Sequence, residues 1–249
     1  MAKPLRTASA TATVVVSLFL TAKAASASAI LVHDYELNGN LGDALGGPSL
    51  VAYGGTLGAS GYTFGANQGL SLSSGINASD YSIVLDFSIA NTSGYRKLID
   101  FKSRASDNGL YNLNTALDFY PQPAGPALAL QADTVRRVTL TRDGSTNTTN
   151  GYVNGVVQFT FVDGSAVSTF TGPGNIVNFF MDDFATSQRE ASAGFADAIR
   201  IYDGALTAGE VAPPLASVPE PMSLVLLGSG IVALARRGAR CKSALRNYS

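Results

Sequence analysis

The sequence contains no tryptophan, one cysteine and one histidine among 249 residues, and only 14% of its residues are charged. A lone cysteine excludes a disulfide within the chain, and a single histidine excludes a histidine-based zinc site. The 26 glycines and the 46% hydrophobic content favour a folded chain with many turns over disorder or a coiled coil. At ~150 residues per domain, the length allows one large domain or two small ones.

The net charge of −1 is the sum of three segments of opposite sign. Residues 1–29 carry +3, residues 30–217 carry −8 from 9 basic and 17 acidic side chains, and residues 218–249 carry +4. An acidic central segment repels phosphate, which argues against nucleic acid as a partner. The basic ends therefore need an explanation of their own.

The N-terminus has the pattern of a secretory signal peptide. Lys3 and Arg6 precede an apolar run, and small residues follow it. This order predicts a signal peptide over residues 1–29, with cleavage after Ala27 or Ala29. The alternative is a buried N-terminal helix, but such a helix normally pairs an apolar stripe with a charged face.

The C-terminus holds a second apolar segment. Pro219-Glu220-Pro221 precedes an uncharged run over residues 222–235, and Arg236 and Arg237 follow directly. At ~1.5 Å per residue the run makes a helix of about 21 Å, shorter than the ~30 Å hydrocarbon core of a bilayer. It can span only with local thinning and with the arginines at the cytoplasmic face. A core helix is the weaker alternative, because the run is apolar on all sides.

Residues 219–249, with this motif, short apolar helix and arginine pair, resemble the PEP-CTERM sorting signal. The resemblance implies recognition by an exosortase, a membrane protease of Gram-negative bacteria that make extracellular polysaccharide. It also implies removal of the tail near Pro219, Glu220 and Pro221, so that Cys241 is lost with it. We therefore expect a cysteine-free protein of the cell surface or extracellular matrix, held transiently at the inner membrane.

Residues 30–212 are predicted to form one all-β domain, with a linker over residues 213–218. Turn residues recur about every 8–12 positions, and Asn154-Gly155 predicts a type I′ hairpin because both positions need positive φ. Thr207 and Glu210 have capping-box spacing and predict one helical turn after the last strand. Strands are expected at residues 31–37, 81–89, 97–102, 116–120, 127–131, 135–142, 176–181 and 198–202, and around the hairpin.

So many short strands favour a two-sheet sandwich over a single open sheet. Residues 81–87, 97–101, 138–155 and 180–211 resemble the LamG-like, concanavalin A-like jelly roll. That resemblance implies a two-sheet antiparallel jelly-roll sandwich. The fold hosts lectins, hydrolases and adhesive modules, so it does not assign a function.

Candidates for catalysis are few. Asp34 and Glu36 are the only acidic pair with a suitable spacing on a strand, whereas retaining glycosidases need two carboxylates about 5–5.5 Å apart. A solvated edge or part of an ion site is the favoured interpretation of this pair. His33 lies in the first strand, where we expect a surface or edge histidine and no general base. The sequence therefore predicts a protein that is not an enzyme.

Calcium is a candidate ligand of the acidic residues late in the chain. Asp182 and Asp183 follow an apolar strand, Glu190 lies a short loop later, and Asp197 begins the next strand. Carboxylate oxygens are the ligands that Ca²⁺ prefers, and related jelly rolls commonly hold calcium at one rim. The alternative is that the two aspartates are solvated or pair with Arg189.

Sugar binding usually needs an aromatic ring beside polar groups. Five tyrosines in or near predicted loops are candidates, although such residues often close a sandwich: Tyr53, Tyr62, Tyr95, Tyr111 and Tyr120. The sequence therefore predicts a non-catalytic module for polysaccharide or another surface protein. The alternatives are a structural matrix protein without a discrete ligand and a degenerate glycoside hydrolase that uses Asp34 or Glu36.

Overall fold

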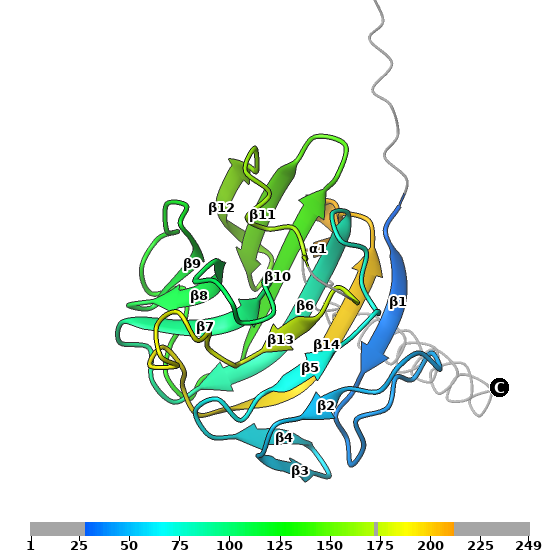
Figure 1. Ribbon diagram of the computed structural model, residues 1–249, viewed down its shortest axis with the longest axis vertical. Helices are drawn as coiled ribbons and strands as arrows, with labels where there is room; N and C mark the ends of the chain where they lie inside the picture. Colours follow the sequence, from blue (N-terminus) through cyan, green and yellow to red (C-terminus); the bar gives the residue numbers. More distant parts are fainter. Residues whose placement is uncertain (1–27, 172–173, 212–249) are drawn as a thin grey trace, which may run out of the picture.

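The computed structural model describes residues 28–171 and 174–211, which form two antiparallel β-sheets stacked face to face (Figure 1). The predicted linker and sorting segment, and nearly all of the predicted signal peptide, lie outside these residues. No helix in the described part of the chain is long and apolar enough to cross a membrane. The prediction of an all-β domain with two antiparallel sheets is confirmed.

Sheet A has eight strands. Seven of them follow the order β12-β11-β10-β6-β14-β4-β3, and the eighth, β1, pairs with β14. β6 and β14 are central strands of this sheet, and they pair with each other from Gly194 opposite Ile89 to Asp203 opposite Tyr81. The strands of sheet A are β1 (Ile30–Tyr35), β3 (Thr56–Gly58), β4 (Gly61–Phe64), β6 (Tyr81–Ile89), β10 (Arg136–Asp143), β11 (Thr148–Val153), β12 (Val156–Val162) and β14 (Gly194–Asp203).

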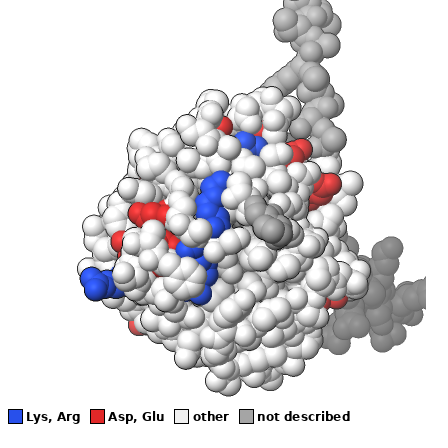
Figure 2. All heavy atoms as spheres, in the orientation of Figure 1, with Lys and Arg blue, Asp and Glu red and all other residues white. Residues whose placement is uncertain are grey.

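Sheet B has six strands in the order β2-β5-β13-β7-β8-β9. They are β2 (Val51–Ala52), β5 (Leu70–Leu72), β13 (Val177–Phe179), β7 (Tyr95–Asp100), β8 (Gly109–Leu113) and β9 (Ala116–Tyr120). The single helical turn α1 (Ala208–Val211) follows β14. Figure 2 shows uncharged atoms over most of one face, with a short central stripe of basic side chains and acidic ones beside it.

The core lies between the sheets and follows from alternation along the strands. In β6, Ile83, Leu85 and Phe87 are at most 1% exposed and point into the core. The residues between them, Val84 and Asp86, therefore point to the outer face of sheet A, because successive side chains alternate. The same alternation in β10 and β14 gives sheet A a polar outer face, and this face carries the candidate site.

Several local predictions agree with the structure. β6 spans the predicted residues 81–89. Asn154 and Gly155 have φ of 49° and 80° between β11 and β12, as a type I′ turn requires. The backbone N–H of Thr207 donates to the Glu210 carboxylate at 2.8 Å, where the helical turn α1 begins.

Two predicted strands are wrong in whole or in part. Residues 127–131 form turns, because Leu128 has φ of 68° and lies 73% exposed outside the core. The strand expected at 176–181 ends at Phe179, since Phe180 has φ of 58° and leaves the extended conformation. Strands β2 to β5 and β8 were not predicted, because they are short and lie among glycines.

Candidate functional site

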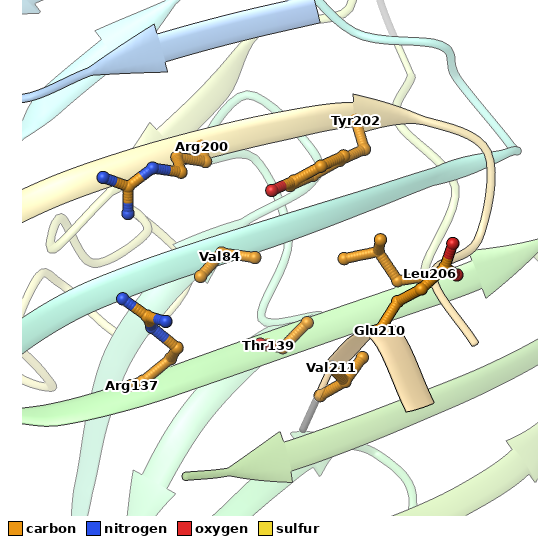
Figure 3. Close-up of a pocket in the computed structure, with 8 residues that line it drawn as sticks. All are labelled: Val84, Arg137, Thr139, Arg200, Tyr202, Leu206, Glu210 and Val211. Atoms are coloured by element: carbon orange, nitrogen blue, oxygen red, sulfur yellow. The ribbon is translucent and has the colours of Figure 1, made fainter. Parts of the chain in front are cut away.

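A hollow of about 250 Å³ opens on the outer face of sheet A, between its central strands and α1 (Figure 3). β6, β10 and β14 supply its floor, and the segment after β14 supplies one wall. Its lining consists of Val84, Arg137, Thr139, Arg200, Tyr202, Leu206, Glu210 and Val211. We call this the sheet A hollow.

Strand register brings these side chains together. Thr139 of β10 pairs with Val84 of β6, and Val84 pairs with Arg200 of β14, so the three form one row across the sheet. Val138 and Leu140 point into the core, so Arg137 and Thr139, which alternate with them, face the hollow. Segments more than 100 positions apart in the sequence therefore build a single surface.

Two arginines of the hollow are held by one carboxylate. Arg137 donates from Nε and Nη2 to the two oxygens of Asp86, each at 2.7 Å, and Arg200 donates from Nη1 to Oδ2 at 3.3 Å. The hydrogen bonds to Asp86 raise the pKa of Arg137. Bidentate pairing fixes the plane of a guanidinium, so these donors are set in place before any ligand arrives.

Arg200 is held from its other side by the two acidic residues considered as catalytic candidates. Its Nε lies 3.1 Å from Oδ1 of Asp34, and its Nη2 lies 2.7 Å from Oε1 of Glu36. Burial raises the pKa of Asp34, and Arg200 opposes that rise. Both carboxylates thus belong to an ion-pair network centred on Arg200.

A second hollow of about 310 Å³ lies beside the first, and Leu206 lines both. Hydroxyl and amide side chains of β10, β11 and the loop between them make up much of its lining. They include Thr141, Thr146, Thr148 and Asn150, and Tyr152 lies with them. The outer face of sheet A therefore offers two adjoining hollows.

The four residues predicted to bind calcium fall in two places. Asp182 and Asp183 are fully buried, and the backbone N–H of Glu190 donates to Asp182 at 2.8 Å. Asp197 lies exposed on β14 in the other sheet. In the described residues, no group of three or more His, Cys, Asp or Glu side chains is arranged to hold a metal ion. Calcium binding stays a prediction.

Lys97 is the residue that the sequence pattern missed beside these aspartates. Its side chain is fully buried, and its Nζ contacts Asp183 and lies 3.8 Å from Oδ1 of Asp182. Arg189 was the expected partner, but the cation that reaches both aspartates comes from β7. The available signal was the place of Lys97 in a predicted strand, directly before the apolar residues Leu98 and Ile99.

His33 lies in the edge strand β1, as expected, but it is only 8% exposed. Its Nδ1 lies 2.7 Å from Oδ2 of Asp43, which also accepts the backbone N–H of Gly47 at 3.0 Å. These contacts fasten the loop after β1 to the strand. Burial raises the pKa of Asp43, but the hydrogen bonds that its carboxylate accepts lower the pKa by more. The pKa of Asp43 is therefore below its ordinary value, and the carboxylate stays ionised.

The tyrosines proposed as sugar platforms differ in exposure. Tyr62 and Tyr111 are buried, at 1% and 0% exposure: Tyr62 belongs to the core between the sheets, and Tyr111 packs against Lys97. Tyr53 and Tyr120 are 51% and 37% exposed. The aromatic ring in the sheet A hollow is that of Tyr202, which the sequence analysis did not single out.

No family model matches the chain, and no curated protein matches it significantly. Solved structures do share its fold. Domain 4 of the extracellular arabinanase AbnA from Geobacillus stearothermophilus, solved with arabinotriose, matches at 18% identity with a TM-score of 0.54, over 74% of this chain and 98% of that domain.

Two further structures match over part of their length. The binding domain of botulinum neurotoxin serotype D is 12% identical with a TM-score of 0.52, over 73% of this chain and 50% of its own. A Trypanosoma rangeli sialidase is 16% identical with a TM-score of 0.53, over 75% of this chain and 32% of its own. The chain thus spans half or less of these two proteins, and the likeness shows the shared sandwich fold.

Proposed function

We propose that this protein is a non-catalytic module that binds carbohydrate in the sheet A hollow. The observation that carries the proposal is the pair of arginines, Arg137 and Arg200, held beside the ring of Tyr202 in an open hollow. Sugar sites combine an aromatic ring with fixed hydrogen-bonding groups. The fold shared with domains that include one solved with arabinotriose supports this choice.

The charges of the hollow favour a neutral sugar. Two guanidinium groups face three carboxylates, those of Asp34, Glu36 and Asp86, and Glu210 lies at the rim. This group carries no excess positive charge that would attract an anionic sugar. Neighbouring hydroxyl groups of a neutral sugar can accept from a guanidinium and donate to a carboxylate in the same network.

The second hollow extends the surface for a longer ligand. Its threonine and asparagine side chains offer both donors and acceptors, and it adjoins the first hollow at Leu206. We therefore propose a polysaccharide segment lying across both hollows as the ligand.

A glycan array tests the proposal. The purified protein is applied to neutral and acidic oligosaccharides, with and without a chelator. Binding to neutral glycans supports the proposal, and its loss with chelator supports calcium. Absence of binding under both conditions contradicts the proposal and favours a structural matrix protein without a discrete ligand.

A degenerate glycoside hydrolase is the second candidate, because Asp34 and Glu36 lie together near the hollow. Both carboxylates contact Arg200, and this network leaves neither as a free acid or base. Release of reducing sugar that disappears in Asp34→Asn or Glu36→Gln would favour this candidate over a binding module.

We also propose export and exosortase sorting, which rest on the terminal sequence patterns alone. The signal-peptide pattern over residues 1–29 and the Pro219-Glu220-Pro221 motif with Arg236 and Arg237 support it. Mass spectrometry of the native mature protein provides the test. Termini near Ala29 and Pro219 are expected, and a mature protein that retains Cys241 contradicts sorting by tail removal.

A further inference from the structure

The buried side chain of Lys97 lies in a pocket of acidic groups on the outer face of sheet B. Its Nζ contacts Oδ2 of Asp183 and lies 4.7 Å from the centre of the Tyr111 ring. The side chains of Lys97, Asp182 and Asp183 are all fully buried. Burying an ammonium and a carboxylate away from water costs several kcal/mol each, and their attraction repays this only with complete hydrogen bonding.

The carboxylate of Asp183 is oriented by a backbone donor at one oxygen and by Lys97 at the other. The backbone N–H of Thr186 donates to Oδ1 at 2.9 Å, whereas the Thr186 hydroxyl donates to Oδ2 of Asp182 at 2.7 Å. The Tyr111 hydroxyl lies 3.3 Å from Oδ2, the oxygen that faces Lys97. The Thr186 backbone N–H is therefore a preorganised donor to Oδ1, of the kind that stabilises a developing oxyanion.

The cluster around Lys97 contains more carboxyl groups than the single ammonium can pair with. Oδ1 of Asp182 is buried and has no hydrogen-bond partner among the described residues. Tyr111 donates to Asp107 at 2.8 Å, which brings a further carboxylate to the cluster. Burial, together with Asp107, Asp182 and Asp183, raises the pKa of Glu190 to about 7, so Glu190 retains a proton near neutral pH.

We propose that Lys97 and Asp183 condense to form an intramolecular isopeptide bond between Nζ and Cγ. A proton first moves from the ammonium to the carboxylate, which gives a neutral amine and a neutral acid. The Nζ lone pair then attacks Cγ, and the negative charge that develops on Oδ1 is held by Thr186. Nζ loses a second proton, and Oδ2 leaves with both protons as water.

The step needs no oxidant or other reactant. One ammonium and one carboxylate become one amide and one water, so atoms and charge balance. Burial raises the pKa of Asp183, but Lys97 and the backbone donors to Asp183 together lower it by more, so the resting state is the ion pair and proton transfer begins the reaction. Exclusion of water favours the neutral pair and then the amide, because a dry site penalises separated charges.

The bond would cross-link strand β7 to the segment that follows β13. The two residues are 86 positions apart in the sequence. A cross-link between distant residues limits the conformations of the unfolded chain, as a disulfide does. The described residues contain no cysteine, so the amide would supply a covalent restraint that disulfides cannot.

Peptide mass spectrometry of the purified full chain tests the inference. Trypsin cleaves after Arg96, Lys102, Arg142 and Arg189 but cannot cleave after an acylated Lys97. We expect residues 97–102 joined to residues 143–189, with the loss of one water, about 18 Da. Fragmentation should locate the link on Asp183. A free peptide of residues 98–102 at full yield, or a link on Asp182, overturns the proposal.

Two variants control the result. Lys97→Arg keeps the positive charge but forms no such amide, so the joined peptide should disappear. Lys102→Arg is the matched control, because Nζ of Lys102 donates to the carbonyl oxygens of Ala166 and Thr169 and forms no ion pair with a carboxylate of residues 28–171 or 174–211. It should retain the joined peptide. If Lys97→Arg does not fold, the peptides of the unsubstituted protein still decide the question.

Discussion

Arg137 and Asp86 form a two-point contact across β10 and β6, with both hydrogen bonds at 2.7 Å. Asp86 also accepts from Arg200, so a single carboxylate orders the two cations of the sheet A hollow. It is only 8% exposed and lies beneath the groups that we propose to contact the ligand. The hollow is therefore a preorganised surface, and its affinity should depend on a residue below it.

Asp86→Asn tests this dependence. The substitution removes the charge that holds both guanidinium groups, so we expect glycan affinity to fall about tenfold and the free energy of unfolding to fall by about 1–3 kcal/mol. Urea unfolding followed by circular dichroism measures the second quantity. Asp133→Asn, at an exposed aspartate with positive φ, is the control and should change neither value.

Asp118→Asn tests the cost of a buried carboxylate on β9. Asp118 is 2% exposed, its Oδ2 has no hydrogen-bond partner within the described residues, and burial raises its pKa to about 6. The folded state thus binds more protons than the unfolded state between the ordinary pKa near 4 and about 6, and stability falls as the pH rises through this window.

The amide variant should therefore be more stable than the parent at pH 8, by about 1–3 kcal/mol, and equal to it near pH 3.5. Thermal unfolding at the two pH values checks the difference. A gain of the same size at both pH values would show that the effect comes from packing and not from ionisation.

Gly155→Ala tests the hairpin between β11 and β12. Gly155 has φ of 80°, a conformation that costs a residue with a Cβ about 1–2 kcal/mol. We expect a fall in the melting temperature. Gly164→Ala is the matched control, because a Cβ there meets open space and the backbone needs no positive φ. Equal effects of the two substitutions would contradict the assignment of a type I′ turn.

Local patterns in the sequence predicted local structure well. The alternation from Tyr81 to Ile89 gave β6 its bounds, and Asn154-Gly155 gave the hairpin, because both signals depend on neighbouring residues. Residues 127–131 have a similar apolar content but lack a partner strand. Leu130 donates to the carbonyl oxygen of Thr115, and the backbone N–H of Leu128 donates to the Thr115 hydroxyl, but these bonds do not form a strand ladder. Whether an apolar segment of this kind forms a strand therefore depends on a neighbouring strand with which it can pair.

The candidate site depends on contacts between distant segments. Alternation places Arg137, Asp86 and Arg200 on outward positions, but nothing in the sequence orders β10, β6 and β14 side by side. The same holds for Lys97, whose partner Asp183 lies in another segment of the chain. Asp34 and Glu36 were found as a pair, because their spacing is local, but their partner Arg200 comes from β14.

The most direct test is a titration of the best neutral oligosaccharide against the unsubstituted protein, Tyr202→Ala and Tyr53→Ala. Tyr202 lines the sheet A hollow, whereas Tyr53 is 51% exposed and lies outside its lining. We predict that Tyr202→Ala loses about tenfold or more in affinity, since an aromatic contact and its buried area disappear, and that Tyr53→Ala binds like the unsubstituted protein. Equal affinity of all three proteins would contradict binding in the sheet A hollow.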